Sequence, residues 1–516
     1  MEAFRGLGLA VLATGFIQGA VASSGHQVPR PRQANLTLVD SQALQDAISI
    51  DTLLSRAEDL YQIANLSWPE YNHPTRVIGS AARANCWKGH NGTLEYIVKA
   101  ISPYGDYYNG SYQAFPAVSG SVSEYRLVLG NNVSETASPM ALTPPTKDKQ
   151  PVQGDLVLVD DDGCLAENYP AGVEGNIALI RRGTCAFGLK STLAGRAGAI
   201  AAVIYNNENG SLQATLGTPD ADQVATFGID LTEAEPIIAT LQGGGSVDAT
   251  AYIDSVVSNI ITKNVVFQTI EGDPDNCVML GAHSDSVSAG PGNNDDGTGT
   301  LSLIEVAIQL TKFRVNNCVR FAWWSAEEEG LLGSDYYAEN LSTEENLKVR
   351  LFMDYDMLAS PNFAYQVYNA TNAANPVGSE ELRNLYVDWY EAQGLNYTFI
   401  PFDGRSDYDG FIKAGIPAGG VATGAEGVKT KEEAAMFGGQ EGDWYDPCYH
   451  QLCDDTGNVN ATAWEMNTKL VAHSVATYAA SFEGFPKRDA AALPTRSLKE
   501  SEYAQNVKYH GPDLIM

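Results

Sequence analysis

The sequence is short of basic residues and of long apolar runs. It contains 32 Lys and Arg against 63 Asp and Glu, which gives a formal net charge of −31 at pH 7. A surface this acidic repels phosphate backbones and anionic lipid, so we expect neither nucleic acid nor a membrane as a partner. Beyond the first residues, no stretch reaches the roughly 18 consecutive apolar residues of a membrane helix. With 516 residues, the chain is long enough for two or three domains.

The first residues predict export from the cell. Arg5 precedes a short apolar stretch, residues 7–17, and small residues at 20–22 fit a cleavage site. The apolar stretch is too short to span a membrane, so we interpret 1–22 as a secretory signal peptide and 23–40 as a pro-segment. Secretion is therefore expected, with retention in a vacuole as the alternative.

Sequons for N-glycosylation follow the signal segment at high density. This density favours a glycosylated protein, because N-glycosylation takes place in the exporting compartment. The ten candidate sites are Asn35, Asn65, Asn91, Asn109, Asn132, Asn209, Asn340, Asn369, Asn396 and Asn460.

Cysteine is also scarce, and its seven copies are an odd number. Export permits disulfides, but spacing alone leaves their connectivity open. One candidate pair brackets a loop, one falls within a single segment, and one would bridge two apolar runs if those runs are neighbours. These candidate pairs are Cys448–Cys453, Cys164–Cys185 and Cys277–Cys318, with Cys86 left over.

Patterning divides the rest of the chain into a large unit and an insert. Helix-like spacing at about 40–70 and at 94–101 is followed by two strand-like segments between about 110 and 130. A block that opens on proline-rich MALTPPTKDKQPVQG then alternates strands and a helix without any metal-type cluster, so we predict a smaller inserted α+β domain. The predicted limits are 41–130 and 256–490 for the main domain, 131–255 for the insert and 491–516 for a C-terminal tail.

Near-continuous apolar runs alternate with helix-like segments after the insert. NCVMLGAH ends at His283, NCVRFAWW is followed by a run of glutamates, and KVRLFMDY is followed by Asp356. Strands that are apolar throughout predict a mostly parallel or mixed central sheet with flanking helices, an α/β fold. Chemistry in such sheets collects at the carboxyl ends of the strands.

Two imidazoles and three carboxylates stand at these strand ends and in nearby loops. Zinc accepts imidazole nitrogen and carboxylate oxygen, and a catalytic zinc keeps a position for water. Three carboxylates and a bridging hydroxide would balance the charge of two zinc ions. Although spacing does not fix the partition, we expect Asp295 between the ions, with one pair of ligands on each: His283 with Asp356, and Glu328 with His450.

Glu327, directly beside a ligand, is the expected general base. A metal-bound water has its pKa lowered toward about 7, so a carboxylate can take its proton and return it to the leaving amine. The hydroxyl of Tyr449, next to His450, is expected to donate to an oxyanion, with a packed loop aromatic as the alternative. Asp285 is expected to hold the far ring nitrogen of His283.

Other acidic and imidazole side chains have structural interpretations. Asp296 fits the cap of the following helix, whereas Asp295 fits a ligand. The glutamate run could be a solvated face, but its position after FAWW disfavours that interpretation for the first two residues. Four histidines lack a metal-type context and are interpreted as structural: His73, His90, His473 and His510.

Taken together, the motifs resemble the co-catalytic zinc aminopeptidase family that includes aminopeptidase Y and the secreted leucine aminopeptidases. GAHSDSV, GPGNNDDGTG, AWWSAEEEG, MDYDM, GRSDYDGF, GIPAGG, TGAE and CYH occur in the family's order across most of residues 255–480. The insert, with GNIALIRRGTCAFGLKSTLAGRAGAIAAVIYNN, resembles the protease-associated (PA) domain of many family members. MDYDM departs from the common Asn-Phe-Asp-Met form but retains Asp356.

The resemblance implies a zinc exopeptidase fold with the five ligands above, Glu327 as base and Tyr449 as oxyanion donor. It also implies that the substrate's amino group lies near Glu327 and Asp356, in a cleft that the segment around Arg405 lines. The expected activity is removal of N-terminal residues from peptides by a secreted, monomeric enzyme.

Three alternatives remain from the sequence. One makes the insert the main functional unit, as a protein-interaction module. A related carboxypeptidase would need a cationic pocket for the terminal carboxylate of its substrate, whereas the site is acidic. A receptor-like relative would have lost ligands, whereas all five are present. The insert is expected to restrict the access of large substrates to the cleft.

Overall fold

The computed structural model describes residues 36–80, 89–207, 210, 212 and 214–489. Among these residues, no helix is both long and apolar enough to cross a membrane. Several predictions fall outside the described residues: those on the signal peptide, most of the pro-segment, Asn35, Cys86, Asn209, the tail from 491 and His510.

The strands in chain order are β1 (Tyr108–Leu129), β2 (Asn132–Val133), β3 (Ser138–Pro139), β4 (Val152–Leu158), β5 (Ile177–Arg181), β6 (Ala201–Tyr205), β7 (Thr226–Ile229), β8 (Asp248–Thr269), β9 (Asp273–His283), β10 (Asn317–Trp324), β11 (Val349–Tyr355), β12 (Gln366–Tyr368), β13 (Thr398–Ile400) and β14 (Ala418–Ala422).

The α-helices are α1 (Ser41–Asp46), α2 (Ile50–Asn65), α3 (Trp68–Tyr71), α4 (Gly89–Ile101), α5 (Phe187–Arg196), α6 (Leu231–Gln242), α7 (Gly297–Leu310), α8 (Leu332–Asn340), α9 (Thr343–Lys348), α10 (Ser379–Ala392), α11 (Tyr408–Lys413), α12 (Lys431–Phe437) and α13 (Ala461–Ala480).

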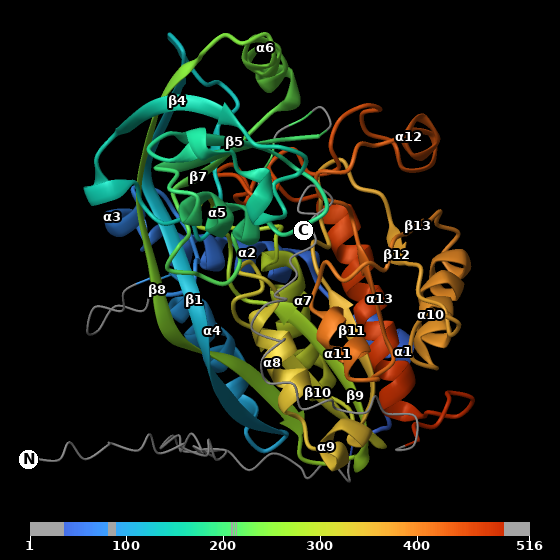
Figure 1. The fold of residues 1–516 in the computed structure, drawn as a ribbon. Coiled ribbons are helices and arrows are strands. Elements are labelled where there is room, and N and C mark those ends of the chain that lie inside the picture. The colour runs from blue at the N-terminus through green and yellow to red at the C-terminus, as the bar shows by residue number, and fades with distance from the viewer. Residues whose placement is uncertain (1–35, 81–88, 208–209, 211, 213, 490–516) are drawn as a thin grey trace, which may run out of the picture.

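The described strands form one mixed sheet that runs through the molecule (Figure 1). Its order is β13-β12-β14-β11-β9-β10-β8-β4-β5-β6-β7-β3, and β1 pairs with β8 and with β2. β9 is parallel to both β10 and β11, and β11 is parallel to β14. Antiparallel pairs join β10 to β8 and β12 to β14. The predicted α/β fold with a mostly parallel or mixed sheet is confirmed.

Helices cover both faces of the central strands, which explains their uninterrupted apolar sequences. β11 is buried along its whole length. Leu280, Phe321 and Met353 share a core with residues of α7, α10 and α13. Met279, Trp324 and Phe352 face the opposite side and pack with residues of α8 and α11. A parallel sheet enclosed in this way leaves its strand ends as the accessible place for a site.

One long ribbon replaces the two strands expected between 110 and 130. β1 is continuous over Tyr108–Leu129 and pairs with β8 along its length, with one register shift between Val122 and Glu124. β4 continues the sheet from β8 into the block that carries β5, β6, β7, α5 and α6, and this block has cores of its own (Figure 1). The predicted boundary at 255 falls within β8, which is shared by the two predicted domains. The predicted domain limits stay a prediction.

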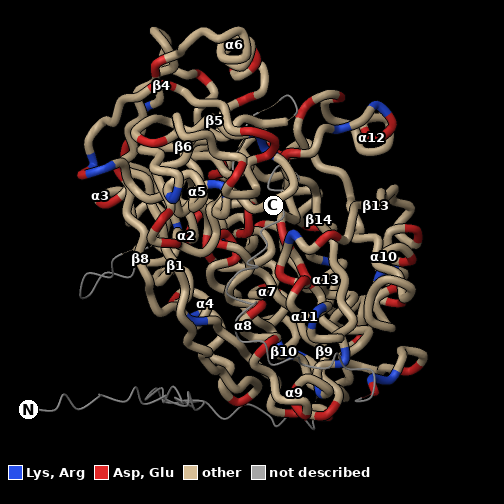
Figure 2. The backbone as a smooth tube through the Cα atoms, viewed as in Figure 1, with Lys and Arg blue, Asp and Glu red and all other residues tan. Residues whose placement is uncertain are grey.

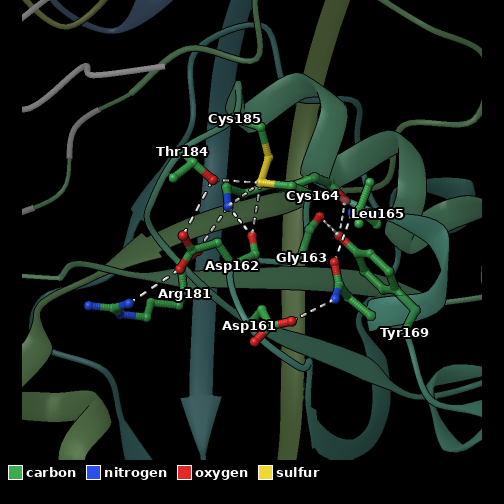
Figure 3. The surroundings of a disulfide bond; sticks show 11 residues. Asp161, Asp162, Gly163, Cys164, Leu165, Tyr169, Arg181, Thr184 and Cys185 are labelled. Carbon is green, nitrogen blue, oxygen red and sulfur yellow. Dashed lines mark hydrogen bonds and ion pairs between the residues drawn. A yellow bond between two sulfur atoms is a disulfide. The ribbon is translucent and has the colours of Figure 1, made fainter.

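Within the described part of the chain there are three disulfides, and they are the three predicted pairs. Cys277 and Cys318 join the neighbouring strands β9 and β10. Cys164 and Cys185 join loops that follow the parallel strands β4 and β5. Figure 3 shows the second bond beside Asp162, which forms an ion pair with Arg181 at 3.3 Å.

Acidic residues are more numerous than basic ones, with 63 Asp and Glu against 32 Lys and Arg. In Figure 2 the acidic positions (red) are scattered over many elements of the described chain. The described sequons differ in exposure, which bears on access for a glycosyltransferase. Asn65, Asn91 and Asn460 are half-buried, and the exposed ones are Asn109, Asn132, Asn340, Asn369 and Asn396.

Candidate metal centre

The carboxyl ends of three parallel strands bring the predicted ligands together. His283 is the last residue of β9, two glutamates follow β10, and Asp356 follows β11. His283 is in register with Trp324 of β10, so these ends lie at the same edge of the sheet. Asp295 precedes α7, whose first turn Asp296 caps by accepting a hydrogen bond from the Gly299 amide. The predicted cap is therefore confirmed.

The loop that carries His450 reaches the same edge from the C-terminal part of the chain. The Cys448–Cys453 disulfide closes this loop. His450 has a positive φ of 56°, a backbone conformation that side-chain-bearing residues adopt rarely. The closed loop and the constrained backbone limit where the imidazole can lie.

Asp295 lies between the two imidazoles. Its Oδ1 is 3.2 Å from His283 Nε2, and its Oδ2 is 3.2 Å from His450 Nε2. On the His283 side, Asp356 Oδ1 is 3.7 Å from the ring nitrogen. On the other side, Glu328 Oε2 is 3.1 Å from His450 Nε2. The partition of the ligands between two ions stays a prediction.

The cluster is buried and strongly charged. Burial alone would lower the pKa of His450, but the carboxylates of Glu328 and Asp295 outweigh it and raise that pKa to about 10. Burial would also lower the pKa of His283. Glu327, Asp295 and Asp356 outweigh this effect and raise that pKa well above its ordinary value. The negative charge of the carboxylates therefore stabilises positive charge within the cluster.

Several buried acceptors in the cluster lack a hydrogen-bond donor, which is the observation that tests whether a cation fits. Glu328 Oε2 and Asp356 Oδ1 accept no hydrogen bond from the residues that the structure describes. Possible ligand atoms of two overlapping groups lie within 4.8 Å of one another: His283 with Glu327 and Asp356, and His283 with Asp295 and Glu328. Mixed nitrogen and oxygen donors of this kind suit zinc. The residues present therefore fit a zinc centre.

Glu327 lies among the ligands. Its Oε2 is 3.8 Å from His283 Nε2, and the residue is 4% exposed, so its charge has almost no water to solvate it. Burial raises its pKa well above the ordinary value, His283 opposes the rise and Glu328 adds to it. A carboxyl group whose pKa is raised in this way holds a proton more readily than an exposed one, which favours a role in proton transfer.

Asp285 lies behind the ligands. Its Oδ1 is 3.9 Å from His283 Nδ1, beyond hydrogen-bond distance, and it accepts long hydrogen bonds of 3.4 Å from the amides of Glu327 and Glu328. Asp285 therefore bonds to the backbone of both glutamates and lies near the imidazole of His283. The predicted role of orienting His283 stays a prediction.

The departure of MDYDM from the family's common form places a carboxyl group at position 354. Burial and the nearby Asp356 raise the pKa of Asp354 to about 7. A carboxyl group that keeps its proton offers an O–H donor where an asparagine would offer an N–H donor. Asp354 is therefore more easily protonated than an exposed aspartate.

A cavity of about 430 Å³ opens beside the cluster and is lined by Glu327, Asp356 and Tyr449. The ring of Tyr449 stacks on that of His450 with 3.8 Å between centroids. The wall is apolar at Tyr368 and Ile400, and Phe399 contributes an exposed ring. None of the described residues 131–255 lines this cavity.

Arg405 also lines the cavity. It forms an ion pair with Glu426 at 3.2 Å, and further carboxylates, Asp403 and Glu433, stand in the same wall. The cavity is therefore acidic as well as apolar, and its guanidinium has a carboxylate partner.

Three of the histidines interpreted as structural lie in the described part of the chain, and none of them belongs to the candidate ligand groups. His90 Nε2 is 2.9 Å from Ser284 Oγ and 3.1 Å from Ser325 Oγ, in a buried position behind the strand ends. His473 contacts Ser41 Oγ at 2.7 Å. His73 Nδ1 lies 3.2 Å from the Pro74 carbonyl, and its ring is near that of Tyr71.

Sequence reasoning missed two buried charged residues around the ligand loop. Arg76 donates to carbonyls of the segment between His283 and Asp295, and Asp454 accepts from the amides of Asn294 and Asp295 at 2.9 and 3.1 Å. No signal in the sequence distinguishes them, because their partners are backbone groups.

A buried cluster of nitrogen and oxygen ligands at the strand ends of an α/β sheet is typical of metal-dependent hydrolases. Residues 264–475 match peptidase family M28, and residues 152–237 match the PA domain. Aminopeptidase Y of Saccharomyces cerevisiae is 52% identical over 464 residues, which cover 87% of this chain and 82% of that protein. Leucine aminopeptidase 2 of Arthroderma otae is 42% identical over 93% of this chain and 94% of that protein.

Solved structures show the same fold. The aminopeptidase from Aneurinibacillus sp. strain AM-1 superposes with a TM-score of 0.67 at 25% identity, over 88% of this chain and 98% of that chain. The Bacillus subtilis zinc aminopeptidase BSAP superposes with a TM-score of 0.58 at 21% identity, over 88% of this chain and 98% of that chain.

The chain belongs to peptidase family M28 and carries a PA domain. This confirms the resemblance predicted from the motifs, and with it a hydrolase of the metalloprotease and aminopeptidase class.

Proposed function

We propose that this protein is a secreted, zinc-dependent aminopeptidase that removes N-terminal residues from peptides. The observation that carries the proposal is the convergence of two imidazoles and four carboxylates beside a cavity of about 430 Å³. The relatives named aminopeptidase Y and leucine aminopeptidase 2 support the same activity.

Two zinc ions per chain are proposed, with Asp295 between them. The 3.2 Å distances from its two oxygens to His283 and His450 support a bridging position. His283 and Asp356 would hold one ion, and Glu328 and His450 the other. When bound, zinc supplies Lewis acidity that makes a water molecule easier to deprotonate and polarises the scissile carbonyl.

The protein's own side chains would then move protons and orient groups. Glu327 takes the proton of the attacking water and returns it to the nitrogen of the leaving peptide, for which its raised pKa suits it. The hydroxyl of Tyr449 donates a hydrogen bond to the oxygen that becomes negative at the carbonyl carbon. Asp285 keeps the backbone of both glutamates in place.

The charge of the cavity favours a substrate amine over a substrate carboxylate. Glu327 and Asp356 line the end of the cavity that meets the ligand cluster, where they would accept hydrogen bonds from a protonated amino terminus. A carboxypeptidase would need a guanidinium or ammonium group directed at the substrate, whereas Arg405 pairs with Glu426. A terminal amine held at this end leaves the first peptide bond beside the ligands.

The decisive experiment compares two substrates on the purified protein. A leucyl amide with an unblocked amino group should be hydrolysed, and an N-blocked peptide with an unblocked carboxyl end should not. Chelation of zinc should abolish the first activity. If the N-blocked peptide is hydrolysed and the leucyl amide is not, the protein is instead a carboxypeptidase. Purification of the protein from the culture medium of an expressing host would test secretion.

A further inference from the structure

We propose that Arg76 is a positioning residue for the zinc centre: it fixes the loop that joins the ligands His283 and Asp295, although it reaches neither ligand side chain. This inference rests on the proposed zinc site. Arg76 belongs to the segment between α3 and α4, which supplies no ligand, so the inference assigns that segment a role in the site.

Every nitrogen of the Arg76 guanidinium is used on one loop. The side chain is fully buried. Nε donates to the Pro291 carbonyl at 2.8 Å, Nη1 to the Ser284 carbonyl at 2.6 Å and Nη2 to the Gly292 carbonyl at 2.5 Å. These three acceptors lie at both ends of the segment that separates the two ligands. A planar fork with several donors can hold them together, whereas an ammonium group has no such fixed geometry.

The backbone around Arg76 ties the same loop to a third ligand. The Arg76 amide donates to Ser286 Oγ at 2.9 Å, and Thr75 Oγ1 donates to the Val287 carbonyl at 2.9 Å. The Val287 amide in turn donates to Glu328 Oε1 at 3.0 Å. The segment 75–76 therefore influences the position of Glu328 through the loop.

The loop lies so close to the guanidinium of Arg76 that a side chain at Gly292 would not fit between them. Gly292 has a φ of 64°, and a Cβ atom there would stand 3.0 Å from Arg76 Nη2 and 2.3 Å from the Asp295 carbonyl. The close approach thus joins Arg76, Gly292 and the ligand-bearing backbone in one packed unit.

Arg76 also places a permanent positive charge in an acidic region. Burial lowers its pKa, and Asp285, Asp296, Asp454 and Asp295, in order of effect, oppose that change. These carboxylates surround it closely enough to interact, so the guanidinium offsets part of the repulsion between acids that the ligand set brings together. Removal of a partner of this kind, one step from the ligands, weakens metal binding in other proteins by about 10- to 100-fold.

The test is Arg76→Lys, which keeps the charge and loses the fork. The readouts are the dissociation constants of both zinc ions, from competition with a chelator, and the melting temperature of the metal-free protein. We expect at least one zinc dissociation constant to rise at least 10-fold, with a small change in the melting temperature. Unchanged dissociation constants would overturn the proposal.

Arg320→Lys is the matched control. Arg320 is a buried arginine of β10 whose side chain contacts Gln268, Tyr337 and Glu345 instead of the ligand loop. Its replacement should leave both zinc dissociation constants within about twofold. An equal loss of zinc affinity in both variants would contradict the proposal, because it would show a general effect of weakening the fold.

Thr75→Val carries the test if Arg76→Lys does not yield folded protein. It removes the hydrogen bond to the Val287 carbonyl in a side chain of similar shape. A threefold or larger rise in a zinc dissociation constant supports the role of the segment, and no change overturns it. If the unaltered protein itself binds no zinc, the proposed function fails; if it binds two ions and the variants bind them equally well, only this inference fails.

Discussion

Glu327 is the residue on which the proposed chemistry most depends. It lies among the ligands but is expected to act on protons. Glu327→Gln keeps the shape of the side chain and removes its basicity, so kcat on a leucyl amide should fall by about 10²- to 10⁴-fold. Zinc content, measured by elemental analysis, should remain that of the unaltered protein. A variant that turns over normally would contradict the assignment.

Tyr449 offers a finer test of the same reaction. Tyr449→Phe keeps the ring that stacks on His450 and removes only the hydroxyl. If that hydroxyl stabilises the developing oxyanion, kcat should fall by roughly 10²-fold while KM changes little. Steady-state kinetics on the leucyl amide separates the two constants. A change confined to KM would indicate a binding contact instead.

The sequence predicts side chains that act directly and misses residues that act through the backbone. The ligands could be recognised because imidazoles and carboxylates follow apolar strands, and their shared edge follows from a parallel sheet. Arg76 and Asp454 could not be recognised, because their partners are carbonyls and amides that every residue possesses. Only the fold reveals that these particular backbone groups surround the site.

Among the elements, the loop closed by Cys448 and Cys453 is expected to hold His450 in place. Replacing both cysteines by serine removes the closure while leaving the imidazole in the chain. We expect the affinity for one zinc ion to fall about 10-fold, as for loss of a partner that orients a ligand. The measurement is chelator competition, with Cys164→Ser/Cys185→Ser as the control that leaves zinc affinity unchanged. Equal effects of both double variants would contradict this role.

The contact between α8 and α11 should make stability depend on pH. Asp335 of α8 lies so close to α11 that a Cβ atom on Gly410 would stand 2.5 Å from its Oδ1. Burial raises the pKa of Asp335 to about 7, Lys413 opposes the rise, and Asp409 and Glu339 add to it.

Between the unfolded value of about 3.9 and the folded value of about 7, the folded state holds a proton that the unfolded state has lost. The contribution of Asp335 to stability should therefore fall as pH rises through this window. Asp335→Asn should remove that slope. Unfolding of the two proteins at several pH values gives the difference, and parallel profiles would refute the prediction.

Strand boundaries show what patterning alone cannot supply. The segment around Gly120 contains serine and glycine and therefore predicts a break between two strands, whereas β1 continues through it. A Cβ atom at Gly120 would stand 2.7 Å from Leu142 Cδ2, so the glycine permits a close approach within the strand. The approaching residue lies in the following block, and its position is a tertiary feature.

At the scale of the molecule, the acidic ligand set implies that zinc contributes to folding stability. Ions that bind only the folded state stabilise it by about 4 kcal/mol when their concentration is 1,000 times the dissociation constant. Chelation should thus lower the melting temperature as well as abolish activity, and added zinc should restore both. Calorimetry before and after chelation measures the change. An unchanged melting temperature would contradict zinc binding at the buried cluster.

The central claim is that the fold gathers five side chains around two adjacent zinc ions. Anomalous diffraction at the zinc edge, from crystals grown with zinc, tests it most directly. We predict two peaks on either side of Asp295, one beside His283 and Asp356 and one beside Glu328 and His450. No peak at this cluster, or peaks only at other residues, would contradict it.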